Sequence, residues 1–152
     1  MASYEKLAAN RLFRGLPEGA LQSLHDKGET IAVGAGNVLI SEGQNNTQMY
    51  FVLDGELEVR LEENPERFSE LQLGTRGPGS CVGEYSFIDR KPASATVIAT
   101  KPSEVFRISH ETLERLLESS HALGSTVYRN LLLHLVDRLR ATNAELDLFG
   151  PF

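Results

Sequence analysis

The segment from Gly83 to Thr96 carries the residues of this chain that are best suited to chemistry. The acid Glu84 follows the opening glycine at once, and an apolar turn and a charged tip lead through Pro92 into small and hydroxyl residues. Amide groups that start a short helix after a glycine are free donors with a partial positive charge, which suits an anion such as phosphate. The Glu84 carboxylate is then free to accept hydrogen bonds from hydroxyl groups. The segment therefore predicts a binding site for an anion that also carries hydroxyls.

Enzymatic chemistry has weaker support. The histidines are scattered over predicted helices without a His-x-His pair, so capping or surface roles are expected rather than metal ligation. They are His25, His110, His121 and His134. Ser86 and Ser94 have no histidine in their segment, so nucleophilic catalysis has no sequence support. The lone Cys81 excludes an internal disulfide or a cysteine cluster, and it is expected to be a small buried thiol. We expect no enzyme activity, no metal and no cofactor.

The size and charge of the chain indicate an ordinary soluble domain. Its 152 residues are enough for one domain with a single core. The formal net charge of -6 argues against a general nucleic-acid binder, which usually has a basic face. The sequence has no apolar run of the roughly 18 residues that a membrane helix needs, and no secretory signal pattern at its start. A cytoplasmic protein without membrane association is the simplest expectation.

Helical and β-type patterns divide this predicted single domain, residues 1–152, into three parts. Residues 1–28 have apolar residues at helical spacing, and residues 29–108 form short β-prone runs separated by glycine-rich turns. Residues 109–148 return to helical spacing. The pattern predicts a mainly β fold, an antiparallel β-roll or jelly roll, with N-terminal helices and a long C-terminal helix at its sides.

Two details of the predicted roll can be compared with a structure. The pair Asp54-Gly55 is the strongest short hairpin signal in the chain. Further on, Phe68 and Leu73 are expected in one strand, and Gly74–Ser80 is expected to be a loop because it contains so much glycine.

The C-terminal helix is expected to run from about Ser125 to Leu146, after a break at Gly124. One apolar stripe along it repeats in steps of three and four, which is the pattern of a heptad seam. This seam consists of Tyr128, Leu132, Leu135, Leu139, Thr142 and Leu146. A second stripe can face the barrel, and it consists of Leu123, Val127 and Leu131. We favour a homodimer that forms through the seam, and the alternative is a helix that packs only within its own chain.

Two motifs follow one another along the chain. The first is Leu39–Gln44 followed by Met49–Val52 and Gly55, and the second is Gly83–Thr96. In this order and spacing they resemble the strand-turn-strand pattern and the phosphate-binding cassette of the cyclic nucleotide-binding domain family, the sensor module of catabolite activator-type regulators, kinases and gated channels. The resemblance spans nearly the whole chain. Asn46 departs from it, since a small residue is usual at that position.

The resemblance implies a role for each part of the cassette. Gly83 and the amides after it approach the cyclic phosphate, and Glu84 accepts the ribose 2′-hydroxyl. Ser86 adds an amide or hydroxyl donor, and Ser94 meets the phosphate or a guanine edge. The expected ligand-binding residues are Gly83, Glu84, Tyr85, Ser86, Ala93, Ser94 and Ala95.

One residue of the family pattern is missing, which makes this cassette a degenerate one. Family members place an arginine just after the cassette proline to clamp the phosphate, and this position is Ala93 here. Losing such a guanidinium–phosphate contact costs roughly 2–5 kcal/mol, or about thirty-fold to several thousand-fold in affinity. Arg90 and Lys91 lie nearby at the loop tip. They either reach inward or remain solvated charges.

The resemblance implies a stand-alone regulatory sensor that binds cAMP or cGMP and moves its C-terminal helix on binding. Because of Ala93, the alternative is a ligand-free or differently liganded domain for dimerisation or protein interaction, with an effector protein as a possible partner. Catabolite activator-type regulators have a helix-turn-helix after the long helix, but this chain ends at Phe152. We therefore expect no nucleic-acid binding by this chain alone, and we expect Arg129, Arg138 and Arg140 to be solvated charges on the helix.

Overall fold

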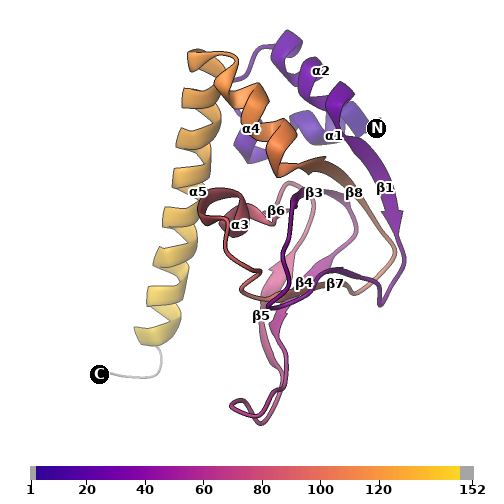
Figure 1. Cartoon of the computed structure of the whole chain (residues 1–152), viewed down its shortest axis with the longest axis vertical. Helices are drawn as coiled ribbons and strands as arrows, with labels where there is room; N and C mark the ends of the chain where they lie inside the picture. The colour runs from indigo at the N-terminus through magenta and orange to yellow at the C-terminus, as the bar shows by residue number, and fades with distance from the viewer. Residues whose placement is uncertain (1–2, 148–152) are drawn as a thin grey trace.

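The short β-prone runs form two antiparallel sheets in the computed structural model, which describes residues 3–147 (Figure 1). The strands are β1 (Glu29–Val33), β2 (Val38–Ile40), β3 (Gln48–Asp54), β4 (Leu57–Leu61), β5 (Leu71–Arg76), β6 (Cys81–Val82), β7 (Thr96–Ala99) and β8 (Ser103–Ser109). Within the described residues, one four-stranded sheet has the order β1-β8-β3-β6 and the other the order β2-β7-β4-β5. The predicted antiparallel roll is confirmed.

Helices cover one end and one side of this roll (Figure 1). They are α1 (Ser3–Ala8), the short 3-10 helix η1 (Arg11–Phe13), α2 (Glu18–Lys27), α3 (Glu84–Asp89), α4 (His110–Glu118) and α5 (His121–Asp147). In Figure 1, α1, α2 and α4 gather at one end of the roll, while α5 stands along its side next to α3. The predicted flanking helices are thus confirmed, and none of those described is long and apolar enough to cross a membrane. The division into one domain of residues 1–152 stays a prediction, and residues 1–2 and 148–152 lie outside the described part.

The strand β3 lies between two apolar clusters. Met49, Phe51 and Leu53 belong to the cluster beneath the helices, whereas Tyr50 and Val52 belong to the cluster inside the roll. Side chains alternate across a strand, so a run that is apolar at every position fits a strand buried on both faces. The strand β3 therefore lies at the centre of the core. It pairs with β6, and the chain continues from β6 into α3.

The turn at Asp54-Gly55 does not make a hairpin, contrary to the prediction. The strand before it, β3, pairs with β6 and β8, whereas the strand after it, β4, pairs with β5 and β7. The chain therefore crosses from one sheet to the other at this corner. The turn between β7 and β8 stabilises this crossing, because the Thr100 amide donates a hydrogen bond of 3.1 Å to the Glu56 carbonyl oxygen. The turn residues specify a change of direction, but long-range pairing decides which strands become neighbours.

The predicted loop at Gly74–Ser80 begins too early. β5 continues to Arg76, which lies opposite Leu57 of β4. The register of this pair shifts by one residue, so the strand contains a β-bulge, and glycine at such a site marks a bulge rather than the end of the strand. Phe68, by contrast, lies before β5 and is 95% exposed, so its assignment to the strand was wrong.

The helix α5 begins at His121 and passes through Gly124 without a break, which corrects the predicted start at Ser125. A Cβ atom at Gly124 would lie 2.5 Å from the backbone oxygen of Leu117 in α4. The missing side chain therefore lets the two helices cross closely.

The two apolar stripes of α5 differ in burial. The stripe expected to face the barrel does pack into the core, with Val127 and Leu131 buried. Along the predicted dimer seam, Leu132 and Leu139 are 63% and 64% exposed, while Leu135 is partly buried against the core. Apart from Leu135, the residues of the seam are thus exposed in the single chain. Dimer formation through it stays a prediction.

Candidate ligand-binding site

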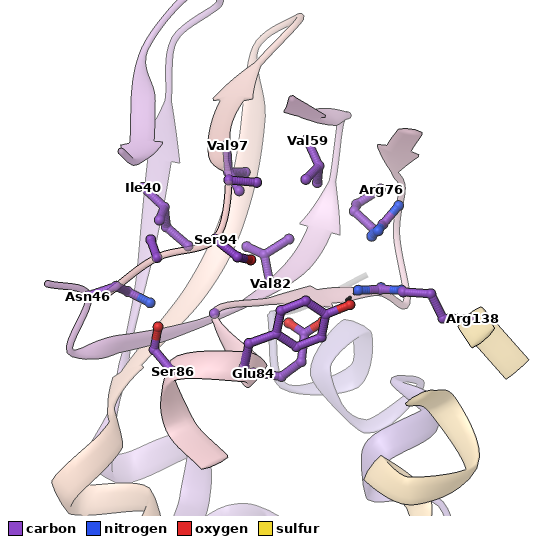
Figure 2. Close-up of a pocket in the computed structure, with 14 residues that line it drawn as sticks. Ile40, Asn46, Val59, Arg76, Val82, Glu84, Ser86, Ser94, Val97 and Arg138 are labelled. Carbon is purple, nitrogen blue, oxygen red and sulfur yellow. Dashed lines mark hydrogen bonds and ion pairs between the residues drawn. The ribbon is translucent and has the colours of Figure 1, made fainter. Parts of the chain in front are cut away.

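A cavity of about 60 Å³ lies between α3, the inner face of the roll and α5 (Figure 2). All of the residues predicted to bind ligand, Gly83–Ser86 and Ala93–Ala95, line this cavity. The structure thus brings both ends of the cassette together, and ligand binding by these residues stays a prediction.

The backbone at Gly83 fixes where α3 begins. Gly83 is the N-cap of α3 and has a φ of 90°, in the left-handed region that favours glycine. A Cβ atom there would lie only 2.5 Å from the Gln48 carbonyl oxygen of β3. Asn46, which departs from the family pattern, supports the same corner, because its amide side chain bonds both the backbone N–H and the carbonyl of Gln48 at 3.2 and 2.9 Å.

The acid Glu84 is buried beside the cavity and is held by α5. Its side chain is 4% exposed, and its Oε1 accepts a hydrogen bond of 2.7 Å from Nη1 of Arg138. Within residues 3–147, no hydrogen bond occupies Oε2, so one carboxylate oxygen remains for a ligand hydroxyl. Burial opposes the charge of Arg138, but the Glu84 carboxylate raises the pKa of this arginine overall.

Arg138 is therefore not a solvated surface charge, contrary to the prediction. Its side chain is only 23% exposed. The sequence carried a signal for this position, because Arg138 continues the buried stripe of Val127, Leu131 and His134 at helical spacing. A charge on the apolar face of a helix needs a partner, and Glu84 is that partner.

His134 is a neutral neighbour of this ion pair. Its Nε2 lies 3.0 Å from Nη2 of Arg138, and because a guanidinium can only donate, Nε2 must accept and carry no proton. Burial lowers the pKa of His134 to about 4, and the charge of Arg138 acts in the same direction. The histidine therefore serves as an uncharged acceptor at neutral pH.

The charges at the loop tip stay outside the cavity. Arg90 forms an ion pair with Glu114 of α4, and its guanidinium lies 5.7 Å from the centre of the Phe87 ring. Lys91 is exposed and does not line the cavity. Neither residue replaces the missing arginine at Ala93, which itself lines the cavity.

A second arginine, Arg76 of β5, also lines the cavity, and it was not among the predicted ligand-binding residues. Directly opposed residues of an antiparallel pair face the same side, so Arg76 shares the inner face of the roll with the fully buried Leu57. Burial lowers the pKa of Arg76, and the nearby charge of Arg138 adds to this effect. The assignment of residues 74–80 to a loop concealed this inward position.

Comparison with known proteins identifies the family. The family model described as "Cyclic nucleotide-binding domain" matches residues 30–120, which is more than half of the chain. The chain therefore belongs to the cyclic nucleotide-binding domain family, as the motifs predicted.

Several relatives have this domain within longer proteins. The chain is 28% identical over 149 residues to the Pycsar effector protein BcPycTIR of Burkholderia cepacia, covering 97% of this chain and 46% of that protein. It is 27% identical over 119 residues to a cAMP-dependent protein kinase regulatory subunit of Yarrowia lipolytica, covering 78% of this chain and 30% of that protein. The chain thus spans less than half the length of either relative.

Solved structures of other proteins have the same fold as this chain. A cyclic nucleotide-binding domain from Methylobacillus flagellatus KT superposes with a TM-score of 0.84 at 25% identity, covering 98% of this chain and 84% of that one. The catabolite activator protein of Thermus thermophilus gives a TM-score of 0.77 at 25% identity, covering 93% and 63%.

Proposed function

We propose that this chain is a regulatory sensor that binds a cyclic nucleotide in the cavity beside α3 and transmits binding to α5. One observation carries the proposal: in a member of this family, the cassette residues meet in one cavity, and the Glu84 carboxylate there is tied to α5 through Arg138.

The proposed pose follows the distribution of polar groups (Figure 2). The phosphate lies at the end of the cavity that contains Ser86 and Ser94, close to the first amides of α3. The ribose 2′-hydroxyl donates to Oε2 of Glu84, and the base extends toward Val59 and Arg138. A ligand hydroxyl that binds Glu84 changes the environment of the ion pair between Glu84 and Arg138 of α5. The ligand therefore has a different affinity for the chain when α5 makes this ion pair than when α5 has moved away from it. Such a difference is the condition for a ligand to shift a conformational equilibrium.

A second candidate function is a ligand-free domain that pairs with another copy or with an effector protein. Two observations favour it: Ala93 stands where the phosphate clamp belongs, and α5 exposes an apolar stripe that includes Leu132 and Leu139.

We also propose that the chain acts by binding rather than catalysis, as a single domain in the cytoplasm. The family is one of regulatory ligand-binding domains. Within residues 3–147, no group of His, Cys, Asp and Glu side chains is arranged to hold a metal ion.

Calorimetric titration with cAMP and with cGMP separates the two candidates. The sensor predicts saturable binding by the unmodified chain, weakened by the missing clamp. Absence of binding at millimolar ligand would contradict it. If Ala93→Arg then restored binding, the cavity would be a ligand site that had lost its clamp, and the second candidate would be favoured.

A further inference from the structure

A wider polar groove adjoins the phosphate end of the cavity. It measures about 520 Å³, against about 60 Å³ for the cavity itself. Asn46 and Ser86 line both spaces, so they form the boundary between them. Beyond this boundary, the groove lies between the turn before β3, the end of α3 and the start of α4. A ligand group that passes Asn46 and Ser86 therefore leaves the cavity and enters the groove.

The hydroxyl of Ser86 at this boundary is available to a ligand. Ser86 is only 5% exposed, and within the described residues its hydroxyl makes no hydrogen bond. Figure 2 shows the hydroxyl turned toward the side chain of Asn46, at the end where the proposed pose has its phosphate. Burying an unpaired polar group is costly, so a buried hydroxyl normally has a partner. A ligand oxygen at the boundary supplies that partner.

Two cationic side chains that do not reach the cavity line this groove instead. They are Arg90 and Lys91. Arg90 is paired with Glu114, whereas Lys91 forms no ion pair with any residue of the described range 3–147. Glu111 also lines the groove, but its carboxylate is paired with Arg115. Lys91 is thus a charge that no neighbouring acid compensates.

The backbone at the end of α3 fixes where these cations stand. Arg90 caps the helix with a φ of 59°, in the left-handed region that residues other than glycine rarely adopt. Its amide donates to the Ser86 carbonyl at 3.0 Å, and the Lys91 amide donates to the Asp89 carboxylate at 2.9 Å. A conformation of this kind persists only where its surroundings stabilise it. The turn therefore holds Arg90 and Lys91 beside the groove.

We propose that the cavity and the groove together bind a nucleoside 5′-diphosphate, with its first phosphate at Ser86 and its second phosphate beside Arg90 and Lys91. The proposal rests on the proposed function, because it keeps the ribose on Glu84 and the first phosphate at the same end of the cavity. Ala93 leaves that end without the family's arginine, whereas the groove next to it has two cations. A cyclic phosphate is closed onto its ribose and has no second phosphate to bind them. A diphosphate uses both spaces.

The second phosphate has a modest and measurable effect on affinity. Water and salt weaken contacts with exposed cations, so each such contact changes affinity by about two-fold to five-fold. With two cations in the groove, a nucleoside diphosphate is expected to bind about three-fold to twenty-fold more tightly than the monophosphate. This ratio is expected to shrink as the ionic strength rises, because salt screens exposed charges.

The test is a calorimetric titration of the full chain in buffer without divalent cations. The ligands are a nucleoside 5′-diphosphate, the matching 5′-monophosphate and the matching 3′,5′-cyclic nucleotide, in the adenine and the guanine series. The unmodified chain is expected to bind the diphosphate at least about three-fold more tightly than the monophosphate. Lys91→Met removes the charge from an exposed side chain. It is expected to lower this ratio by at least about two-fold and to leave the affinity for the other two ligands unchanged.

The matched control is Lys101→Met, which changes another exposed lysine, between β7 and β8, that lines neither the cavity nor the groove. It is expected to leave the ratio unchanged, and equal effects of the two lysine changes overturn the inference. A chain that binds cAMP or cGMP, but binds the diphosphate no more tightly than the monophosphate, overturns the inference and leaves the sensor function intact. Binding of the diphosphate without binding of either cyclic nucleotide supports the inference and contradicts the cyclic ligand. Failure of every ligand to bind overturns both proposals.

Discussion

Replacing Arg138 with methionine is expected to destabilise the protein far more than the same change at a surface arginine of α5. Methionine keeps the helical, unbranched side chain and removes only the charge and its donors. The change leaves the Glu84 carboxylate, 4% exposed, without the donor that now lies 2.7 Å from its Oε1. Glu84 then remains buried with an unbalanced charge.

The magnitude follows from the burial of the pair. Removing one partner of a fully buried ion pair costs about 3–5 kcal/mol, whereas an exposed pair is worth about 0–1 kcal/mol. Arg138 is 23% exposed, so water weakens the pair somewhat and a loss of about 2–3 kcal/mol in the free energy of unfolding is expected. For a domain of this size, this loss lowers the melting temperature by roughly 4–12 °C.

Urea and thermal unfolding of Arg138→Met measure this loss, with the exposed Arg140→Met as the control. The double variant Glu84→Gln/Arg138→Met is expected to recover part of the loss, because a neutral amide replaces the unpaired carboxylate. Equal stabilities of Arg138→Met and Arg140→Met, within about 0.5 kcal/mol, would refute the inference that a buried pair links α5 to the cassette.

Three further outcomes are expected. Leu139→Asp should convert a homodimer to a monomer in light scattering with little loss of stability, since Leu139 is 64% exposed; an unchanged mass would show that the seam does not join two chains. Gly124→Ala should lower the free energy of unfolding by about 1–2 kcal/mol despite the better helix propensity of alanine, because its Cβ would lie 2.5 Å from the Leu117 oxygen. Gly19→Ala in α2, where nothing lies within 4 Å, should instead be neutral or stabilising, and equal effects of the two changes would contradict this reasoning. Finally, the free energy of unfolding should fall as the pH drops from about 6.5 toward 4, because the unfolded chain protonates His134 before the folded one does. His134→Gln should flatten this slope, and an unchanged slope would assign it to other groups.

The parts of the site that are continuous in sequence could be predicted from it. Gly83 and Glu84 stand side by side in the cassette, and their residue types alone indicate a glycine turn followed by a hydrogen-bond acceptor. Ala93 could be recognised as a departure for the same reason, because its position is defined by its neighbours.

Arg138 and Arg76 were missed because tertiary packing brings them to the cavity. Arg138 lies far along the chain from Glu84, and nothing local marks the two as partners. Arg76 faces inward because of a β-bulge, which the glycine content of its segment concealed. The hairpin prediction at Asp54-Gly55 was wrong for a related reason, since a turn motif does not encode which sheet the next strand joins.

The most direct test of the proposed function is a crystal structure of the chain grown with millimolar cAMP or cGMP. The proposal predicts a ligand in the cavity, with its ribose 2′-hydroxyl within hydrogen-bond distance of Oε2 of Glu84 and its phosphate at the end that contains Ser86 and Ser94. An empty cavity, or a ligand bound without contact to Glu84, would contradict it.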